Sequence, residues 1–526
     1  MYEPITPKPK STVLKIMSIV PMIVILIGIV ILGIIFVPKF MENAALNNSY
    51  YDEIYNGYED YDIPDIDNYN QNSWDEPVNP RIPDDLPDCD FGRYEFTIIF
   101  ASGRYNDSYW DMRDIVADEE TGDIINDAVY RRNRTVEEKY NIKIRGVYSD
   151  DPYRNINNNV KAGINEFDLV ALPMQNLTAQ LLQEGYLVDL YNIPYIDFSK
   201  PWWDKNAIQQ LSFGHKLYFT PNALLTSDKD ALSVFLFNKE RTMIYGLEDP
   251  YQLVMNGLWT IDKMREMAIS ASNDLNGDGI MDENDSFGLL VDGYKLYDNI
   301  LGSGHYMAAK DANDFPVNNI QDPVIHTSFD KWINIYNNNE RYTTFIQPDT
   351  ERRMDMFATG TPLEGRALFM YESMFYIPTL RSLETDFGIL PNPKLDTAQE
   401  KYYTPVNTQH ASAISIPVTN GDLERTGIIL EALTAESYYT LLPAYYNAML
   451  SGRYYWDDQS GDMLDILLNY KCYDLADVYG WGYEIKNRLL NMPFDNDNDF
   501  VSVCEKYSQK MNAAMTKAID MFKELY

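Results

Sequence analysis

Cysteine and histidine are scarce in this chain. Its 526 residues include three cysteines, at positions 89, 472 and 504, and four histidines. An odd cysteine count without a CxxC pair argues against both a disulfide framework and a zinc site. The sequence also lacks an HExxH pattern, a P-loop and a GxGxxG run, so the usual signatures of zinc proteases, P-loop ATPases and dinucleotide-binding enzymes are missing.

Positive charge is the second deficit. The chain has 43 lysines and arginines against 79 acidic residues, which gives a formal net charge of −36. A phosphate backbone needs a basic binding face, so this balance argues against nucleic acid as a partner. Aromatic residues, by contrast, are plentiful, with 41 tyrosines and 8 tryptophans. Most of them are expected to build cores, and some could form flat binding surfaces for ligands.

The N-terminus contains one long apolar run. Residues 16–37 read IMSIVPMIVILIGIVILGIIFV, without a charge, which is long enough to cross a bilayer of ~30 Å as a helix. Three lysines precede the run and acidic residues soon follow it. The positive-inside rule therefore predicts a cytoplasmic segment over 1–15 and a single-pass protein of the cell membrane with its bulk outside. Cleavage near Ala44 and Ala45, as in a secretory signal, stays open.

Two segments of different composition follow the apolar run. Residues 38–90 are rich in Asp, Asn, Tyr and Pro, which predicts a disordered acidic tether. From residue 91 the pattern becomes globular: YEFTIIFA (94–101) reads as a buried strand, 127–144 as a helix running into a strand, and EFDLVALP (166–173) as another strand. This alternation predicts an α/β protein with mainly parallel sheets. The remaining chain is too long for one core, so two domains are expected.

Residues 274–285, DLNGDGIMDEND, read as a calcium loop. Oxygen-bearing side chains recur at the spacing of the EF-hand, with Gly279 at the sixth position, where the chain must turn sharply. The predicted ligands are Asp274, Asn276, Asp278, Asp282 and Asp285, together with the backbone carbonyl of Ile280. The twelfth position holds Asp where a bidentate Glu is usual. A solvated Asp/Gly turn is the alternative. Because the loop joins a predicted helix (260–272) to a predicted strand (286–292), we expect calcium to have a structural role.

Several stretches, taken in order, resemble a known family. They are EFDLVALP, QEGYLVDLYNIPYIDFSKPWW (183–203), GHKLYFTPNALLTSDKDALSVFLFNKE (214–240), LWTIDKM (258–264) with the calcium loop, GRALFMYES (365–373) and DFGILPNPK (386–394). Together they resemble the family-1 extracellular solute-binding proteins of bacterial ABC importers, the carbohydrate-binding group that includes maltose-binding protein. The likeness covers about residues 92–526. It departs from the family at the start, where a lipid-modified cysteine is usual.

The resemblance implies a periplasmic-binding-protein-like fold of two lobes, with a hinge and a cleft between them. The first lobe would span about 91–226 with a return from about 402, and the second about 232–400 with the C-terminal helices. Ligands of open α/β folds bind at the carboxyl ends of strands, so loops that follow strands supply the candidates. The candidate ligand-binding residues are Arg104, Gln175, Asp228, Asp230, Glu372 and Trp481.

The sequence therefore predicts an extracytoplasmic receptor that binds a carbohydrate, expected to be an oligosaccharide, and delivers it to ABC permease subunits by hinge closure. No catalytic residue is assigned, because the chain shows no nucleophile elbow and no metal-hydrolase pattern. With 79 acidic residues, a pair of carboxylates alone does not indicate a glycosidase. Two alternatives remain: a membrane-anchored glycan sensor and an enzyme acting on glycosides.

Overall fold

The computed structural model describes residues 81–101, 113–337, 344–346, 349–358, 365–381, 385–450 and 458–524. The chain divides into two units, one of residues 1–83 with Tyr526 and one of residues 84–525. Of the first unit, only residues 81–83 are described, and they form neither helix nor strand. Everything below concerns the second unit. The predicted membrane span, most of the predicted tether and Arg104 lie outside the described residues.

The first lobe is built on a five-stranded sheet in the order β2-β1-β3-β13-β4. Its strands are β1 (Tyr94–Ala101), β2 (Ile142–Ser149), β3 (Leu169–Pro173), β4 (Phe219–Thr220) and β13 (Ser412–Ser415). β1 pairs in parallel with β2 and β3, whereas β13 is antiparallel to β3 and β4. β3 is buried along its whole length, as expected of a strand that is covered on both faces.

The second lobe is built on a sheet in the order β11-β5-β10-β6-β9. Its strands are β5 (Ser233–Asn238), β6 (Phe287–Val291), β9 (Thr344–Ile346), β10 (Ala367–Ser373) and β11 (Phe387–Leu390). β6 pairs in parallel with β10 and β9, whereas β5 is antiparallel to β10 and β11. Two small pairs complete the strands: β7 (Ala308–Lys310) with β8 (Pro316–Asn318), and β12 (Thr404–Pro405) with β14 (Lys471–Cys472).

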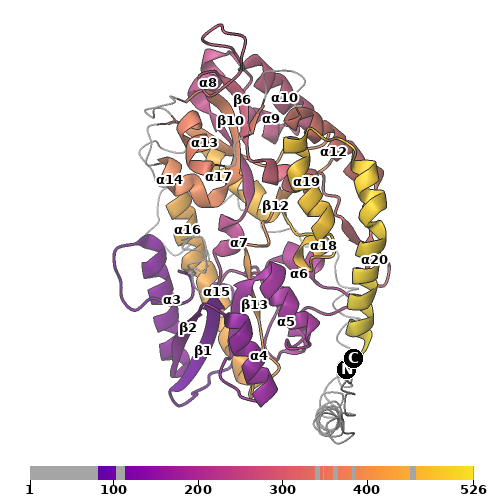
Figure 1. Cartoon of the computed structure of the whole chain (residues 1–526). Helices are drawn as coiled ribbons and strands as arrows, with labels where there is room; N and C mark the ends of the chain where they lie inside the picture. Colours follow the sequence, from indigo (N-terminus) through magenta and orange to yellow (C-terminus); the bar gives the residue numbers. More distant parts are fainter. Residues whose placement is uncertain are drawn as a thin grey trace, which may run out of the picture. The chain divides into compact units, whose positions relative to one another are not determined.

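The antiparallel strand of each sheet locates the junction of the lobes. β5 follows a crossing from the first lobe, and β13 follows the return from the second. A strand that enters from the junction must run away from it, so the other strands of each sheet run toward it. The junction therefore lies at the carboxyl ends of the parallel strands, which is where open α/β folds bind ligands. Figure 1 shows the short helix α7 (Ser227–Asp230) between the two sheets.

Helices account for most of the remaining structure. In chain order they are α3 (Ile124–Tyr140), α4 (Pro152–Ala162), α5 (Ala179–Gln183), α6 (Lys205–Leu211), α7, α8 (Lys239–Ile244), α9 (Pro250–Met255), α10 (Ile261–Ser270), α11 (Leu296–Leu301), α12 (Pro323–Tyr336), α13 (Thr350–Phe357), α14 (Ile377–Arg381), α15 (Leu423–Tyr439), α16 (Leu441–Leu450), α17 (Asp458–Asn469), α18 (Leu475–Val478), α19 (Tyr483–Asp495) and α20 (Phe500–Glu524). Single-turn helices are η3 (Met174–Thr178), η4 (Leu190–Asn192), η5 (Gly293–Lys295) and η6 (Met374–Tyr376).

Aspartate begins many of these helices. The side chain of Asp123 accepts hydrogen bonds from two backbone amides at the start of α3, and Asp204 does the same for one amide of α6. Thr260 caps α10. Such caps satisfy amides that have no partner within the helix and favour negative charge at its N-terminus. Part of the large acidic excess is therefore used to fix where helices start.

The mixed α/β, two-lobe architecture expected from the sequence is confirmed. β1 occupies the predicted residues 94–101, and α3 and β2 match the predicted helix and strand over 127–144. The stretch 176–190 predicts a helix capped at Gly185, and this is confirmed: α5 ends at Gln183, and Gly185 takes a positive φ of 72° that a helix cannot continue through. The sheets are also less uniformly parallel than expected. Each contains one antiparallel strand, β5 or β13, because the chain enters that strand from the junction.

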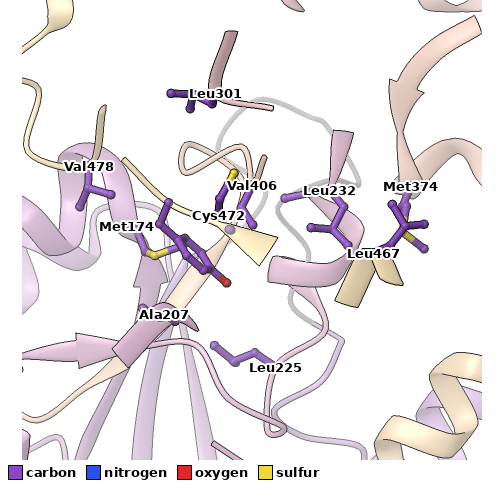
Figure 2. Close-up of a cluster of buried hydrophobic side chains, with 14 of the residues drawn as sticks. Met174, Ala207, Leu225, Leu232, Leu301, Met374, Val406, Leu467, Cys472 and Val478 are labelled. Carbon is purple, nitrogen blue, oxygen red and sulfur yellow. The ribbon is translucent and has the colours of Figure 1, made fainter. Parts of the chain in front are cut away.

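Buried apolar side chains fill part of the junction. Figure 2 shows one such cluster, in which Leu225 comes from the first crossing, Val406 from the return segment and Met374 from η6, directly after β10. Cys472 of β14 lies in the same cluster and is fully buried. The core is therefore continuous from one lobe through the crossing segments to the other. Within the residues that the structure describes, no helix combines the length and apolar character needed to span a bilayer.

Candidate functional site

Helix α7 brings two of the predicted residues to the junction. The carboxylate Oδ1 of Asp230 accepts a hydrogen bond of 2.9 Å from the hydroxyl of Tyr445. Its Oδ2 lies 3.9 Å from the guanidinium of Arg113, a side chain that is 51% exposed. Burial raises the pKa of Asp230 to about 6, against the opposing effect of Arg113. Asp230 is thus a nearly buried acid that borders an exposed cation.

Asp228 belongs to a buried cluster of four charges. Its carboxylate lies 2.9 Å from the ammonium of Lys229 and 2.5 Å from that of Lys471, and Lys471 lies 2.7 Å from Asp204. Burial opposes ionisation of Asp228, but the two ammonium groups outweigh it and lower its pKa. Burial likewise opposes the charge of Lys471, yet its two carboxylate partners raise its pKa. The four side chains link the first crossing to β14 and α6.

Glu372 lies near the end of β10 and its carboxylate forms an ion pair with the guanidinium of Arg353; both side chains are buried. The backbone amide of Ser373 donates a hydrogen bond of 2.9 Å to Glu372. The hydroxyl of the same serine donates one of 2.7 Å to the carbonyl of Asp230. One residue therefore connects the end of β10 to α7, and the structure brings Glu372 and Asp230 into one neighbourhood.

Gln175 follows β3 and faces the C-terminal part of the chain. Its amide nitrogen donates to the carbonyl oxygen of Asp477 at 3.0 Å and to the carboxylate at 2.8 Å. Thr408 donates to the same carboxylate at 2.6 Å, and Lys486 lies 2.5 Å from it. Asp477 thus gathers donors from the first lobe, the return segment and α19. Asp477 and its donors form a second polar group at the junction. It is separate from the Asp230 group, by which we mean Asp230 with Arg113, Tyr445 and Ser373.

His410 lies near this second group. Burial lowers its pKa to about 4, and the charges of Lys295 and Lys486 contribute. The imidazole is therefore neutral at physiological pH. Lys295 follows β6 and donates to the hydroxyl of Ser233 at 3.0 Å. The ends of β6 and β10 and the start of β13 thus all place polar or charged side chains at the junction.

Trp481 is packed into the core in this conformation. It is 4% exposed, and its ring stacks on Tyr479 with centroids 4.7 Å apart and an angle of 11° between the planes. Phe213 contacts it edge-on at 6.2 Å. The structure therefore places Trp481 away from the solvent surface, in an aromatic cluster that joins the first lobe to the C-terminal segment.

Sequence reasoning missed the aromatic residues immediately after Glu372. Phe375 and Tyr376 form η6, which packs against α7, and both rings are partly exposed. Tyr439, at the end of α15, and Tyr446, on α16, are partly exposed as well. The signal was available: Phe375 and Tyr376 follow a buried strand as closely as Glu372 does. Beside the Asp230 group, they offer the flat apolar surfaces on which sugar rings pack.

The predicted calcium loop folds as a series of tight turns between α10 and β6. Gly277 and Gly279 take positive φ values of 73° and 78°. Their amides donate to the two carboxylate oxygens of Asp274 at 2.7 and 2.8 Å. Asp285 is fully buried and accepts hydrogen bonds of 2.9 Å from the amides of Leu275 and Asp282. The loop's acidic side chains therefore organise its own backbone.

The donor set of the loop suits a hard cation, because the six predicted ligands all offer oxygen. Calcium would be held by these residues and would neutralise their clustered charge. In the described parts of the chain, however, no three His, Cys, Asp or Glu side chains are grouped closely enough to form a preformed metal site. The calcium site thus remains a prediction that rests on the spacing and chemistry of the donors.

Comparison with known proteins finds similar solved structures but no match to a family model or a curated protein. Among solved structures, UspC of M. tuberculosis is 13% identical, with 80% of this chain and 100% of that chain covered and a TM-score of 0.52. A sugar transporter from Rhizobium etli in an open conformation is 12% identical, with 80% and 99% covered and a TM-score of 0.52.

A third structure, a cyclo/maltodextrin-binding protein complexed with maltotetraose, is 13% identical. The alignment with it covers 85% of this chain and 98% of the other protein, with a TM-score of 0.50. Nearly the whole of each of these proteins is matched, so the likeness concerns a complete two-lobe fold. The resemblance noted in the sequence is confirmed at the level of that fold.

Proposed function

We propose that this protein is an extracytoplasmic solute-binding receptor that captures a carbohydrate at the junction of its lobes and delivers it to an ABC permease. Capture would be reversible and coupled to hinge closure about the crossing segments. The observation that carries the proposal is the meeting of both sheets' strand ends at α7. There, acidic side chains lie beside partly exposed aromatic rings.

The chemistry of this junction suits a sugar. A sugar presents hydroxyl groups, which need paired donors and acceptors, and apolar ring faces, which pack on aromatic rings. Asp230 and Glu372 would accept from hydroxyls, and Arg104 and Gln175 would donate to them. Phe375 and Tyr376, which sequence reasoning did not single out, would supply the flat surfaces.

Asp228, Trp481, Glu372 and Gln175 are all buried, so each would act after a rearrangement of its present packing. Asp228 lies within its charge cluster and Trp481 is stacked on Tyr479, so hinge motion would have to expose them. If they stay packed, their contribution is to hold the hinge rather than to touch the ligand. Comparing Asp228 and Trp481 variants in binding and in stability separates these two roles.

Two features of the N-terminal and second-lobe sequence complete the proposal. Residues 16–37 would anchor the protein in the cell membrane, with the acidic tether holding the binding unit outside. The loop over 274–285 would hold calcium through Asp274, Asn276, Asp278, Ile280, Asp282 and Asp285. The ion would offset repulsion between carboxylates and stabilise the turn between α10 and β6.

The two alternatives use the same fold. A glycan sensor would bind the same ligand and differ in its membrane partner. An enzyme acting on glycosides would place two carboxyl groups across the scissile bond, about 5–5.5 Å apart for retention or about 6.5–9.5 Å for inversion. Two of the structural neighbours reported above are named as a binding protein and a transporter, which favours the receptor.

Thermal unfolding against a panel of glycans tests the proposal. The full chain is purified in a detergent without a sugar headgroup and heated with each glycan. A ligand at about 100 times its Kd adds about 2.7 kcal/mol to native stability, so one glycan class should raise Tm and be recovered intact. Recovery of a cleaved glycan would assign the protein to the enzymes. A shift with peptides alone would overturn the carbohydrate assignment.

A further inference from the structure

The second lobe contains a polar groove away from the junction. It encloses about 430 Å³ between α10, α12 and the turn that follows α19. Figure 1 shows α12 and α19 side by side in the second lobe, and the two helices are in contact. The volume falls within the range of small-molecule sites, roughly 300–1,000 Å³. None of the predicted ligand-binding or calcium-loop residues lines it.

Four asparagines, which we call the amide set, give the groove its character. They are Asn334 and Asn337, on or just after α12, and Asn496 and Asn498, in the turn between α19 and α20. Each amide group carries two N–H donors and one carbonyl acceptor. The amide nitrogen of Asn337 donates to the carbonyl of Asp497 at 3.0 Å, whereas its side-chain oxygen is buried without a donor. A ligand of this groove must therefore offer both hydrogen-bond donors and acceptors to the amide set.

An ion pair joins two of the three charged residues that line the groove. The ammonium of Lys331 lies 2.7 Å from the carboxylate of Asp262 and donates to the carbonyl of Leu395 at 2.9 Å. Arg265 adds one further cation to the lining. A multiply charged anion would have to approach Asp262 and would have at most one hydroxyl to donate to the amide set. A neutral molecule with several hydroxyls avoids both difficulties, because each hydroxyl can donate and accept.

We infer that this groove is a second binding site for a neutral carbohydrate of one or two sugar units. The size matches the volume of the groove, and the amides offer the donors and acceptors that sugar hydroxyls need. Ile261 and Ile335 supply the small apolar part of the lining. The site does not depend on capture at the junction, so the two assignments can fail separately. A sugar held on the outer part of the second lobe could keep a longer glycan close to the receptor.

Photolabelling locates the site directly. The full chain, in a detergent without a sugar headgroup, is irradiated with diazirine derivatives of maltose, lactose and cellobiose, and labelled peptides are mapped by mass spectrometry. At least one probe should label peptides that contain 331–337 or 496–498. Unmodified parent disaccharide should reduce that labelling at least tenfold, and inorganic phosphate should not.

Asn334→Trp fills the groove from an exposed position of α12 and should reduce its labelling at least tenfold. Asn491→Trp is the matched control, since it replaces an exposed asparagine of α19 that does not line the groove, and labelling should persist. Equal Tm values for the two variants show that both are folded. Absence of groove labelling with all three probes, equal labelling of both variants, or displacement by phosphate would overturn the inference. Labelling at junction peptides is scored separately.

Discussion

Replacing Lys471 with methionine tests the buried charge cluster at the hinge. The lysine is almost fully buried and lies within 2.7 Å of both Asp204 and Asp228. Lys229 would still form an ion pair with Asp228, whereas Asp204 would lose its ion-pair partner and keep only hydrogen-bond donors and the more distant charge of Lys229. Tyr473 donates to Asp204 at 3.0 Å and the amide of Ala207 at 3.0 Å. Removing one partner of a buried pair costs about 3–5 kcal/mol.

The magnitude converts into a measurable change of melting temperature. Residues 84–525 form one unit of about 440 residues, and unfolding entropy near 60 °C is about 2.1 cal/mol/K per residue. The unit therefore has an unfolding entropy of about 0.9 kcal/mol/K, and a loss of 3–5 kcal/mol lowers Tm by roughly 3–6 °C. Differential scanning calorimetry measures both the shift and the enthalpy.

Controls separate this effect from loss of a surface ion pair. Lys263 pairs with Glu248 and Glu266, whose side chains are 62% and 67% exposed, so Lys263→Met should cost less than about 1 kcal/mol. Asp204→Asn added to Lys471→Met removes the uncompensated charge and should recover part of the loss. A Lys471→Met shift no larger than that of Lys263→Met, or a double variant that loses the full sum, would refute the reasoning.

Three further outcomes follow. A calcium chelator, or Asp274→Ala, should lower Tm by several degrees and leave the preferred glycan unchanged; an altered preference would refute the purely structural role. Burial raises the pKa of Glu431 from 4.5 to about 7, so its contribution to stability is full below pH 4.5 and is lost as pH rises to 7. The free energy of unfolding should fall by roughly 3 kcal/mol over this pH range. Urea titrations at several pH values should show this fall in the parent and a much smaller one in Glu431→Gln. Asp230→Asn and Tyr376→Ala should each weaken glycan binding about tenfold or more in calorimetric titrations, with Tm within about 2 °C of the parent. Variants that bind glycan as tightly as the parent would show that the ligand does not bind beside these residues.

Local signals predicted the elements well. The apolar run at 94–101 forms β1 at the same residues, and the helix predicted over 260–272 is α10, which begins after its cap Thr260 and ends at Ser270. These features depend on neighbours a few residues apart, which a sequence displays directly. The cap of the helix in 176–190 is a local signal too, since Gly185 adopts the left-handed conformation that ends α5.

The site was harder to predict because its partners are distant in sequence. Gln175 bonds to Asp477, 302 residues away, and Asp230 to Tyr445, 215 residues away. Nothing near Glu372 indicates that Arg353 neutralises it. Trp481 was a candidate ligand-binding residue, whereas Tyr479 stacks on its ring in the structure. Strand-end position correctly pointed to the junction, but it could not distinguish buried charge pairs from exposed surfaces.

The most direct test of the central claim is the distance between the lobes with and without glycan. Spin labels at Asn158→Cys on α4 and Asp330→Cys on α12, both exposed positions, report it by pulsed electron resonance once Cys89 is replaced by serine. The account predicts that a bound glycan, recovered intact, shifts the distance distribution to a single closed state. Saturating glycan that leaves the distribution unchanged, or that is recovered cleaved, would contradict capture by hinge closure.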